Sequence, residues 1–272
     1  MDSRSEAQAI VAQIRRYIED VRLFEGDEFV VPPGALEVEA PIAAPEAAGT
    51  YEAAASEAAA VGAVEEPPTQ EPPEEPPSVA EGPAPVPDED LAAFEQRICA
   101  CEKCPLAAGR TRFVFGEGDP QAGIMFIGEA PGADEDRSGR PFVGAAGQLL
   151  DKIIVAMGLQ REQVYICNIV KCRPPNNRNP EPAEVDQCLP YLKKQIEMVQ
   201  PRVICLLGRV AAGALLGSEE SIGRLRGRFL RYGEIPVRVT YHPAALLRNQ
   251  QYKRPVWEDV EELRRQYDGV EL

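Results

Sequence analysis

Four short apolar runs, separated by stretches with helical periodicity, constrain the fold of this chain more than any other feature. The runs are GIMFIG (123–128), VYICNIV (164–170), RVICLLG (202–208) and IPVRVTY (235–241). The sequence predicts helices at 143–159, 181–199, 210–217 and 255–267. Pro190 is expected to kink or interrupt the second of them. Wholly apolar strands that alternate with helices are typical of a parallel sheet covered on both faces.

Ligands of such sheets bind at the carboxyl ends of the strands. The residues that stand at these ends are Glu129, Asn168, Gly208 and His242. His242 is the only histidine of the chain, so it is either an ordinary surface or core residue or a group retained for chemistry. The sequence therefore predicts a site at this edge of the sheet.

The charge of the chain divides near residue 91. Residues 1–90 contain 4 basic and 21 acidic side chains, whereas residues 91–272 contain 25 basic and 23 acidic side chains. The net charge of −15 therefore belongs to the N-terminal third. Arginines cluster at 224–231 and 171–178, so the C-terminal part can present a basic face to nucleic acid.

Three parts are expected along the chain: a helix within 1–30, a linker at 31–90 and a globular domain at 91–272. The helix is amphipathic, and it either packs on its own chain or binds a protein partner. The linker is rich in Pro, Ala and Glu, which predicts disorder. Because the sequence shows neither a signal peptide nor 18 consecutive apolar residues, we expect a cytoplasmic monomer without membrane contact.

Seven cysteines in a cytosolic chain point to core positions, metal binding or redox chemistry rather than disulfides. Four of them have metal-like spacing: Cys101, Cys104, Cys172 and Cys188. Four thiolates suit zinc or an iron–sulfur cluster, and the spacing alone does not choose between them or exclude unrelated cysteines. Cys99 is a rival partner for Cys104, although a CxxC spacing favours Cys101. Cys167 and Cys205 lie inside apolar runs and are expected in the core.

Three segments together resemble the family 4 uracil-DNA glycosylases, bacterial and archaeal enzymes with a [4Fe–4S] cluster. They are GEGDPQAGIMFIGEAPGADEDRSGRPFVGAAGQLLD, VYICNIVKCRPPNNRNPEPAEVDQC and TYHPAALLR, within a resemblance over about residues 94–267. The resemblance implies a three-layer α/β/α sandwich around a four-stranded parallel sheet, and excision of uracil from DNA in base excision repair. It also assigns the cluster to Cys101, Cys104, Cys172 and Cys188, which favours iron over zinc.

The resemblance implies that uracil lies at Glu129, Phe142 and Asn168, with His242 and Glu129 as the catalytic residues. The chemistry agrees. A flipped uracil needs an aromatic face, which Phe142 can supply. An Asn amide accepts from uracil N3–H and donates to O4, and cytosine inverts both contacts. A His donor stabilises the negative charge that gathers on uracil O2.

Other assignments concern water and DNA. Ala130 occupies the position at which the best-known glycosylase family has a water-positioning Asp, so the water-activating group stays open. The acidic run 134–136 is expected to be solvated. Leu246 is expected to fill the gap left by the flipped base, or else to pack within its helix. Phosphate contacts are expected from Arg248, Arg173 and Arg178.

Two alternatives are left beside the enzyme. One is a protein that binds uracil-DNA without turnover; relatives of that kind carry a His-containing insertion that KCRPPNNRNPEPAEV lacks. The other is a non-catalytic, zinc-stabilised nucleic-acid-binding module that uses the same four cysteines.

Overall fold

The computed structural model describes residues 89–269. The predicted N-terminal helix and almost all of the predicted linker lie outside this range. The helices are α2 (Leu91–Ile98), α3 (Ala133–Ser138), α4 (Ala145–Ala156), α5 (Pro182–Val199), α6 (Arg209–Leu216), α7 (Ile222–Leu225), α8 (Pro243–Arg248) and α9 (Lys253–Asp268). The strands are β1 (Glu117–Gly118), β2 (Ile124–Gly128), β3 (Tyr165–Asn168), β4 (Val203–Leu207), β5 (Phe229–Tyr232) and β6 (Ile235–Thr240). Short 3₁₀ turns lie at Pro105–Gly109, Arg161–Gln163, Pro175–Asn177 and Gln250–Tyr252.

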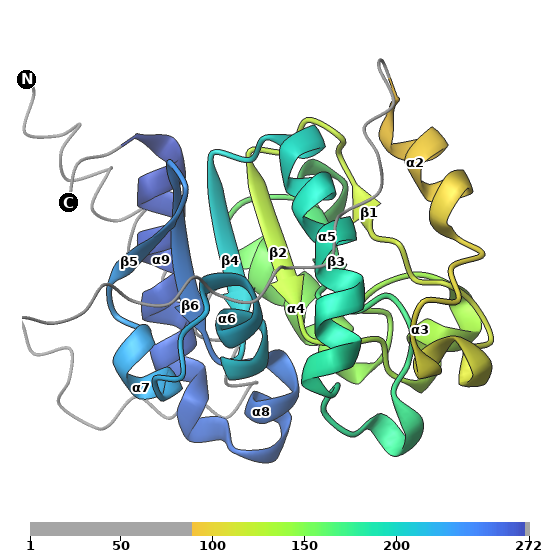
Figure 1. The fold of residues 1–272 in the computed structure, drawn as a ribbon. Helices are drawn as coiled ribbons and strands as arrows, with labels where there is room; N and C mark the ends of the chain where they lie inside the picture. The colour runs from red at the N-terminus through yellow and green to blue at the C-terminus, as the bar shows by residue number, and fades with distance from the viewer. Residues whose placement is uncertain (1–88, 270–272) are drawn as a thin grey trace, which may run out of the picture. The chain divides into compact units, whose positions relative to one another are not determined.

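The sheet has six strands in the order β1-β3-β2-β4-β6-β5 (Figure 1). The four predicted strands, β3, β2, β4 and β6, are mutually parallel, as expected. The expected total of four strands was wrong, because β1 and β5 add an antiparallel strand at each edge. β1 has only two residues, and β5 (FLRY) is only half-buried, so neither produces the apolar run that marks a central strand.

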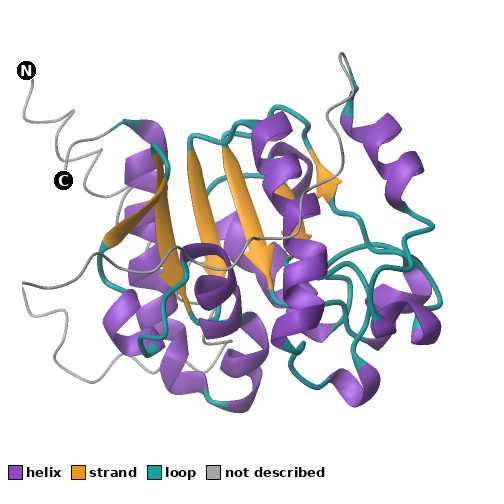
Figure 2. Ribbon diagram, viewed as in Figure 1, coloured by secondary structure: helices purple, strands orange, loops and turns teal. Residues whose placement is uncertain are grey.

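Helices lie on both sides of the sheet (Figure 2), and each face carries its own core, as the predicted α/β/α sandwich requires. Along β2, Met125 and Ile127 pack into one core, while Ile124 and Phe126 pack into the other. The first core includes residues of α2, α5 and α6, and the second includes residues of α4, α8 and α9. Period-2 alternation with both faces covered explains why the strands read as unbroken apolar runs.

Helix α5 runs without interruption from Pro182 to Val199, so the interruption that was the alternative to a kink at Pro190 is wrong. Pro182 occupies the first turn, where its missing N–H costs nothing. Pro190 itself is buried, and Leu192 and Ile196 beyond it pack fully into the core. Burial of this face offsets the hydrogen bond that Pro190 removes.

Within residues 89–269, no helix combines the length and the apolar character needed to cross a bilayer.

Candidate active site

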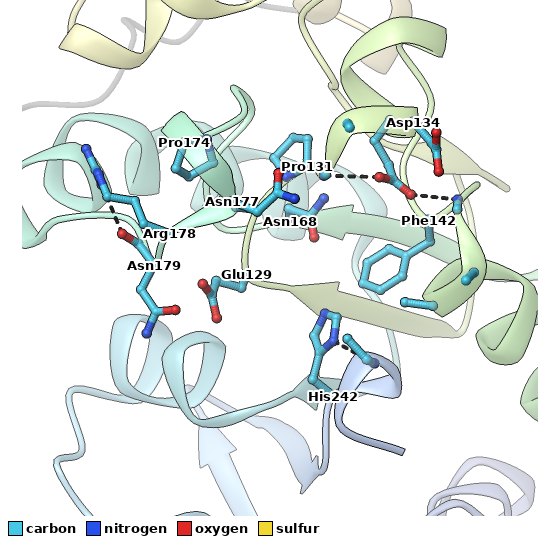
Figure 3. A pocket seen from close by; sticks show the side chains of 18 of the residues that line it. Glu129, Pro131, Asp134, Phe142, Asn168, Pro174, Asn177, Arg178, Asn179 and His242 are labelled. Carbon is cyan, nitrogen blue, oxygen red and sulfur yellow. Dashed lines mark hydrogen bonds between the residues drawn. The ribbon is translucent and has the colours of Figure 1, made fainter. Parts of the chain in front are cut away.

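A cleft of about 480 Å³ lies at the carboxyl ends of the parallel strands. Its wall and floor come from four parts of the chain: residues 129–135 after β2, residues 142–146 at the start of α4, residues 174–179 after β3, and residues 242–248 of α8. Asn168, the last residue of β3, also lines it. Figure 3 shows Glu129, Phe142, Asn168 and His242 around one cavity. The structure therefore brings together the residues predicted to bind uracil.

Phe142 forms one side of the cleft in a constrained position. Its φ is 51°, in the left-handed region that bulky residues rarely adopt, and its side chain is 5% exposed. Arg161 donates a hydrogen bond of 3.1 Å to its carbonyl oxygen. The ring lies directly over Gly128, where an added Cβ would come within 2.4 Å of Phe142 Cζ. Gly147 of α4 packs so closely that a Cβ there would lie 1.9 Å from the Phe142 carbonyl oxygen.

Asn168 is 1% exposed, and its Oδ1 is buried without a hydrogen-bond partner within the described part of the chain. A buried acceptor left without a donor costs roughly 1–3 kcal/mol. Its carbonyl oxygen accepts from the ammonium of Lys171 at 2.9 Å. Asn168 lines the cleft, and its unpartnered Oδ1 is suited to a ligand that brings an N–H group.

His242 caps α8 from the end of β6. Its Nδ1 accepts from the backbone N–H of Ala244 at 3.1 Å, which leaves the ring proton on Nε2. Burial lowers the pKa of His242 from 6.5 to about 4; the positive charge of Arg248 adds to this, and Glu135 opposes it. The ring lies 5.5 Å from that of Phe142, centroid to centroid. A neutral imidazole with a fixed Nε2–H donor therefore faces the cleft.

This pKa predicts a stability change in acid. Between pH 6.5 and about 4 the unfolded chain binds a proton at His242 that the folded chain does not, so stability falls as the pH is lowered through this window. The loss reaches about 3 kcal/mol at most. Because the chain has one histidine, the imidazole C2–H signal of the untagged protein reports it by NMR. We expect the signal to keep its neutral position down to pH 5; a midpoint near 6.5 in the folded protein would contradict the assignment.

Glu129 lies at the end of β2 with its carboxyl group in the cleft (Figure 3). Burial raises its pKa, and the positive charge of Arg209 opposes the rise. Its carbonyl oxygen accepts from the N–H of Val170, which ties the loop after β2 to β3. Glu129 thus presents to the cleft a carboxyl group that takes up a proton more readily than an exposed carboxylate does.

The acidic run 134–136 was expected to be solvated, which holds for the exposed Asp134 and is wrong for Glu135 and Asp136. Glu135 accepts hydrogen bonds from the backbone N–H groups of Gly132, Val143 and Gly144, at 3.0, 2.8 and 2.8 Å. Asp136 is 4% exposed and accepts from Thr111. Glu135 thus holds the loop around Phe142, and only the Glu three residues after a Gly at a helix start hinted at this capping.

Leu246 was expected either to fill the gap in DNA or to pack within its helix, and without DNA its side chain is packed away. Leu246 is 1% exposed and packs in the core between α4 and α9. The next residue, Leu247, is 53% exposed, and it is one of two large apolar side chains exposed within residues 89–269. Successive residues of a helix point in different directions, so Leu246 faces the core while Leu247 points outward.

The predicted phosphate contacts differ in their surroundings. Arg248 is exposed and lines the cleft. Arg178 also lines the cleft, but its guanidinium forms a two-bond ion pair with Glu184, at 2.8 and 2.6 Å. Arg173 donates to Asn177 within the same loop. Arg248 is therefore the predicted cation whose charge is most accessible at the cleft.

The four cysteines with metal-like spacing interact with one another. Burial raises the pKa of Cys172, Arg110 opposes the rise, and the thiols of Cys104 and Cys101 add to it; the thiols of Cys172 and Cys104 add likewise to the raised pKa of Cys188. Burial raises the pKa of Cys188 to about 12, and the ammonium and backbone N–H of Lys171 oppose that rise. Cys99 is exposed, and Cys167 and Cys205 lie in the core.

Hydrogen-bond donors lie beside two of these four cysteines. Tyr191 donates its hydroxyl to Cys101 Sγ at 3.2 Å, and Arg110 donates to Cys172 Sγ at 3.5 Å. Within the described range, no three His, Cys, Asp or Glu side chains converge as ligands of one metal ion. Four cysteine thiols are a donor set that suits an iron–sulfur cluster and also a structural zinc ion.

The family profile of the uracil DNA glycosylase superfamily matches residues 115–263, more than half of the chain. The chain belongs to the uracil-DNA glycosylase superfamily. The matched residues include β2, β3, β4 and β6 and all the cleft segments, so the predicted resemblance is confirmed.

Individual relatives place the chain beside the type-4 members of this superfamily. It is 45% identical to the type-4 uracil-DNA glycosylase of Sulfurisphaera tokodaii, over 65% of this chain and 84% of that protein. It is 45% identical to the type-4 uracil-DNA glycosylase of Thermotoga maritima, over 64% of this chain and 93% of that protein. A type-5 uracil-DNA glycosylase of Thermus thermophilus is more distant, at 34% identity over 47% of this chain and 72% of that protein.

Proposed function

We propose that this glycosylase hydrolyses the bond between uracil and deoxyribose in DNA and leaves an abasic site for repair. The observation that carries the proposal is the cleft itself: a buried amide oxygen without a partner, an aromatic ring and an imidazole N–H surround a space at the ends of the parallel strands. Residues 91–272 form the catalytic unit in this proposal.

Phe142 and Asn168, whose side chains meet over Gly128, recognise the uracil base in this proposal. Uracil flipped from the helix stacks on Phe142. Asn168 accepts from uracil N3–H through Oδ1, the acceptor left free in the cleft. Cytosine offers an acceptor at N3, so it leaves that oxygen unpaired and is rejected.

Cleavage follows from where charge develops. The bond to the sugar breaks toward an oxocarbenium ion and a uracil anion, and a donor at uracil O2 stabilises the anion. His242 supplies that donor as a neutral group, since its Nδ1 already accepts from Ala244. Glu129 positions the attacking water, and its raised pKa suits a group that accepts the proton released by that water.

We propose further that Cys101, Cys104, Cys172 and Cys188 hold a [4Fe–4S] cluster. When bound, the cluster supplies a rigid cross-link and an electron-accepting centre. Cys172 and Cys188 bracket the loop of residues 174–179, which lines the cleft. Anchoring both ends of this loop keeps its side chains at the edge of the cleft.

DNA binding predicts contrasting effects at two adjacent leucines. We propose that Leu247, rather than Leu246, enters the space left by the flipped base. Leu247→Ala is expected to change stability by less than about 0.5 kcal/mol. It should lower uracil release from duplex DNA by about tenfold, and far less from single strands, which leave no gap to fill.

Leu246→Ala is the matched comparison. It removes a core side chain and is expected to lower the free energy of unfolding by about 2–5 kcal/mol. Urea unfolding and initial rates on both DNA forms measure the pair. Equal losses on duplex and single-stranded DNA for Leu247→Ala would contradict its proposed role.

The activity is tested by uracil release from a labelled single-stranded oligonucleotide with one uracil, followed by alkaline cleavage of abasic sites. Iron and acid-labile sulfide are measured on the same preparation. Release of uracil with stoichiometric iron supports both proposals. A folded, iron-loaded protein without release would overturn the enzyme in favour of a DNA-binding protein, and zinc in place of iron would overturn the cluster.

A further inference from the structure

Lys171 is completely buried between β3 and the cysteines. Its Nζ donates to the carbonyl oxygen of Asn168 at 2.9 Å and to Oε1 of Gln195 at 2.5 Å. Neither partner carries a charge. Lysine is rarely buried to this extent without a paired charge, because the desolvation of an ammonium group is costly.

The orientation of Gln195 shows that the position of the ammonium group is specified. Its Nε2 donates to the carbonyl oxygen of Phe115 at 3.0 Å and to the hydroxyl of Tyr165 at 3.1 Å. With both amide protons directed there, Oε1 has to face Lys171. The hydrogen bond from Lys171 to Asn168 is thus held by a chain of buried polar groups that spans α5 and β3.

Lys171 also adjoins the cysteines. It directly precedes Cys172, and its ammonium and backbone N–H both act on the sulfur of Cys188. Four thiolates around an iron–sulfur core carry a net negative charge. This charge is the natural counterpart of the buried ammonium group.

We propose that Lys171 is a positioning residue that couples the cysteine centre to uracil recognition. It holds the main chain of Asn168 through one hydrogen bond, and its positive charge balances the charge of the thiolate-bound cluster. The proposal rests on the uracil-excising function and on the cluster proposed above. Lys171 does not touch uracil; it acts through Asn168.

The first test is a double-mutant cycle on the iron-loaded enzyme. Lys171→Met keeps the length of the side chain and removes its charge and donors. It is expected to lower kcat/KM for uracil release by about tenfold, and by less than about threefold in an Asn168→Leu background. Lys152→Met, on the exposed side of α4, is the matched control and should keep wild-type kcat/KM. Equal effects in both backgrounds, or no effect in the wild-type background, would overturn the coupling.

The second test measures the reduction potential of the cluster by protein film voltammetry without DNA. Loss of a buried positive charge disfavours the added electron, so Lys171→Met should have a lower potential than both the wild type and Lys152→Met. An unchanged potential would overturn the charge balance. An iron-loaded wild type that releases no uracil would overturn the proposed function instead, while the potentials still decide the role of the charge.

Lys171→Arg tests the same two roles of Lys171 if Lys171→Met loses iron or unfolds. Arginine keeps the charge but presents its donors differently. We expect a potential close to that of the wild type together with a reduced kcat/KM. A shifted potential, or a wild-type kcat/KM, would count against Lys171 in these roles.

Discussion

Replacing His242 with alanine should lower kcat for uracil release by about 10²–10³-fold, because the transition state loses its donor at uracil O2. KM should change little, since the donor acts mainly when negative charge develops. Single-turnover rates on a uracil-containing single strand measure the effect. His242→Gln retains an N–H donor and is expected to recover part of the rate.

His242→Ala also removes the cap of helix α8, so its effect on stability has to be measured separately from its effect on catalysis. Nδ1 caps α8 through Ala244, and removing a cap costs about 1 kcal/mol of stability. Thermal unfolding of both variants shows whether the protein is folded at the assay temperature. A folded His242→Ala protein with a wild-type kcat would assign His242 to capping alone.

The second large effect is expected at Asn168. Asn168→Asp places a carboxylate where the amide donor faces uracil O4, so kcat/KM for uracil should fall by about 10³-fold or more. Asn168→Leu removes both polar contacts at similar volume and should lose a similar amount. Activity on cytosine relative to uracil should rise in Asn168→Asp, since the carboxylate oxygen that replaces the Nδ2 donor can accept from the amino group of cytosine.

Paired substrates make this test specific. Initial rates on two oligonucleotides that differ only in uracil or cytosine give the discrimination ratio directly. If Asn168→Leu kept the wild-type ratio, Asn168 would not be the group that reads the base.

Much of the fold could be predicted from the sequence, because the central strands are apolar on both faces. The runs that predicted β2, β3, β4 and β6 each lie within two residues of the observed strands. The edge strand β5 was not predicted, because a half-buried strand has no continuous apolar run. An interruption at Pro190 was wrongly expected, because local helix rules take no account of the core into which α5 packs.

The site was predictable where side-chain chemistry is unusual for its position. Asn168 at the end of an apolar run and a lone histidine before a proline both stood out. Leu246 and Leu247 did not differ in sequence, and only the packing of α8 separates them. The sequence did not distinguish Glu135 from its acidic neighbours, because the partners of Glu135 are backbone N–H groups, which are present in every sequence.

The absence of a side chain at Gly128 sets the direction in which the specificity of this enzyme can change. Phe142 and Asn168 Oδ1 both lie within 2.5 Å of the place where a Cβ would stand, so even alanine would displace the stacking ring and the base-reading amide together. Selection for a different base therefore has to act on other side chains of the cleft, such as Asn168 itself or the loop of residues 174–179. The end of β2 remains glycine in any descendant that keeps this mode of recognition.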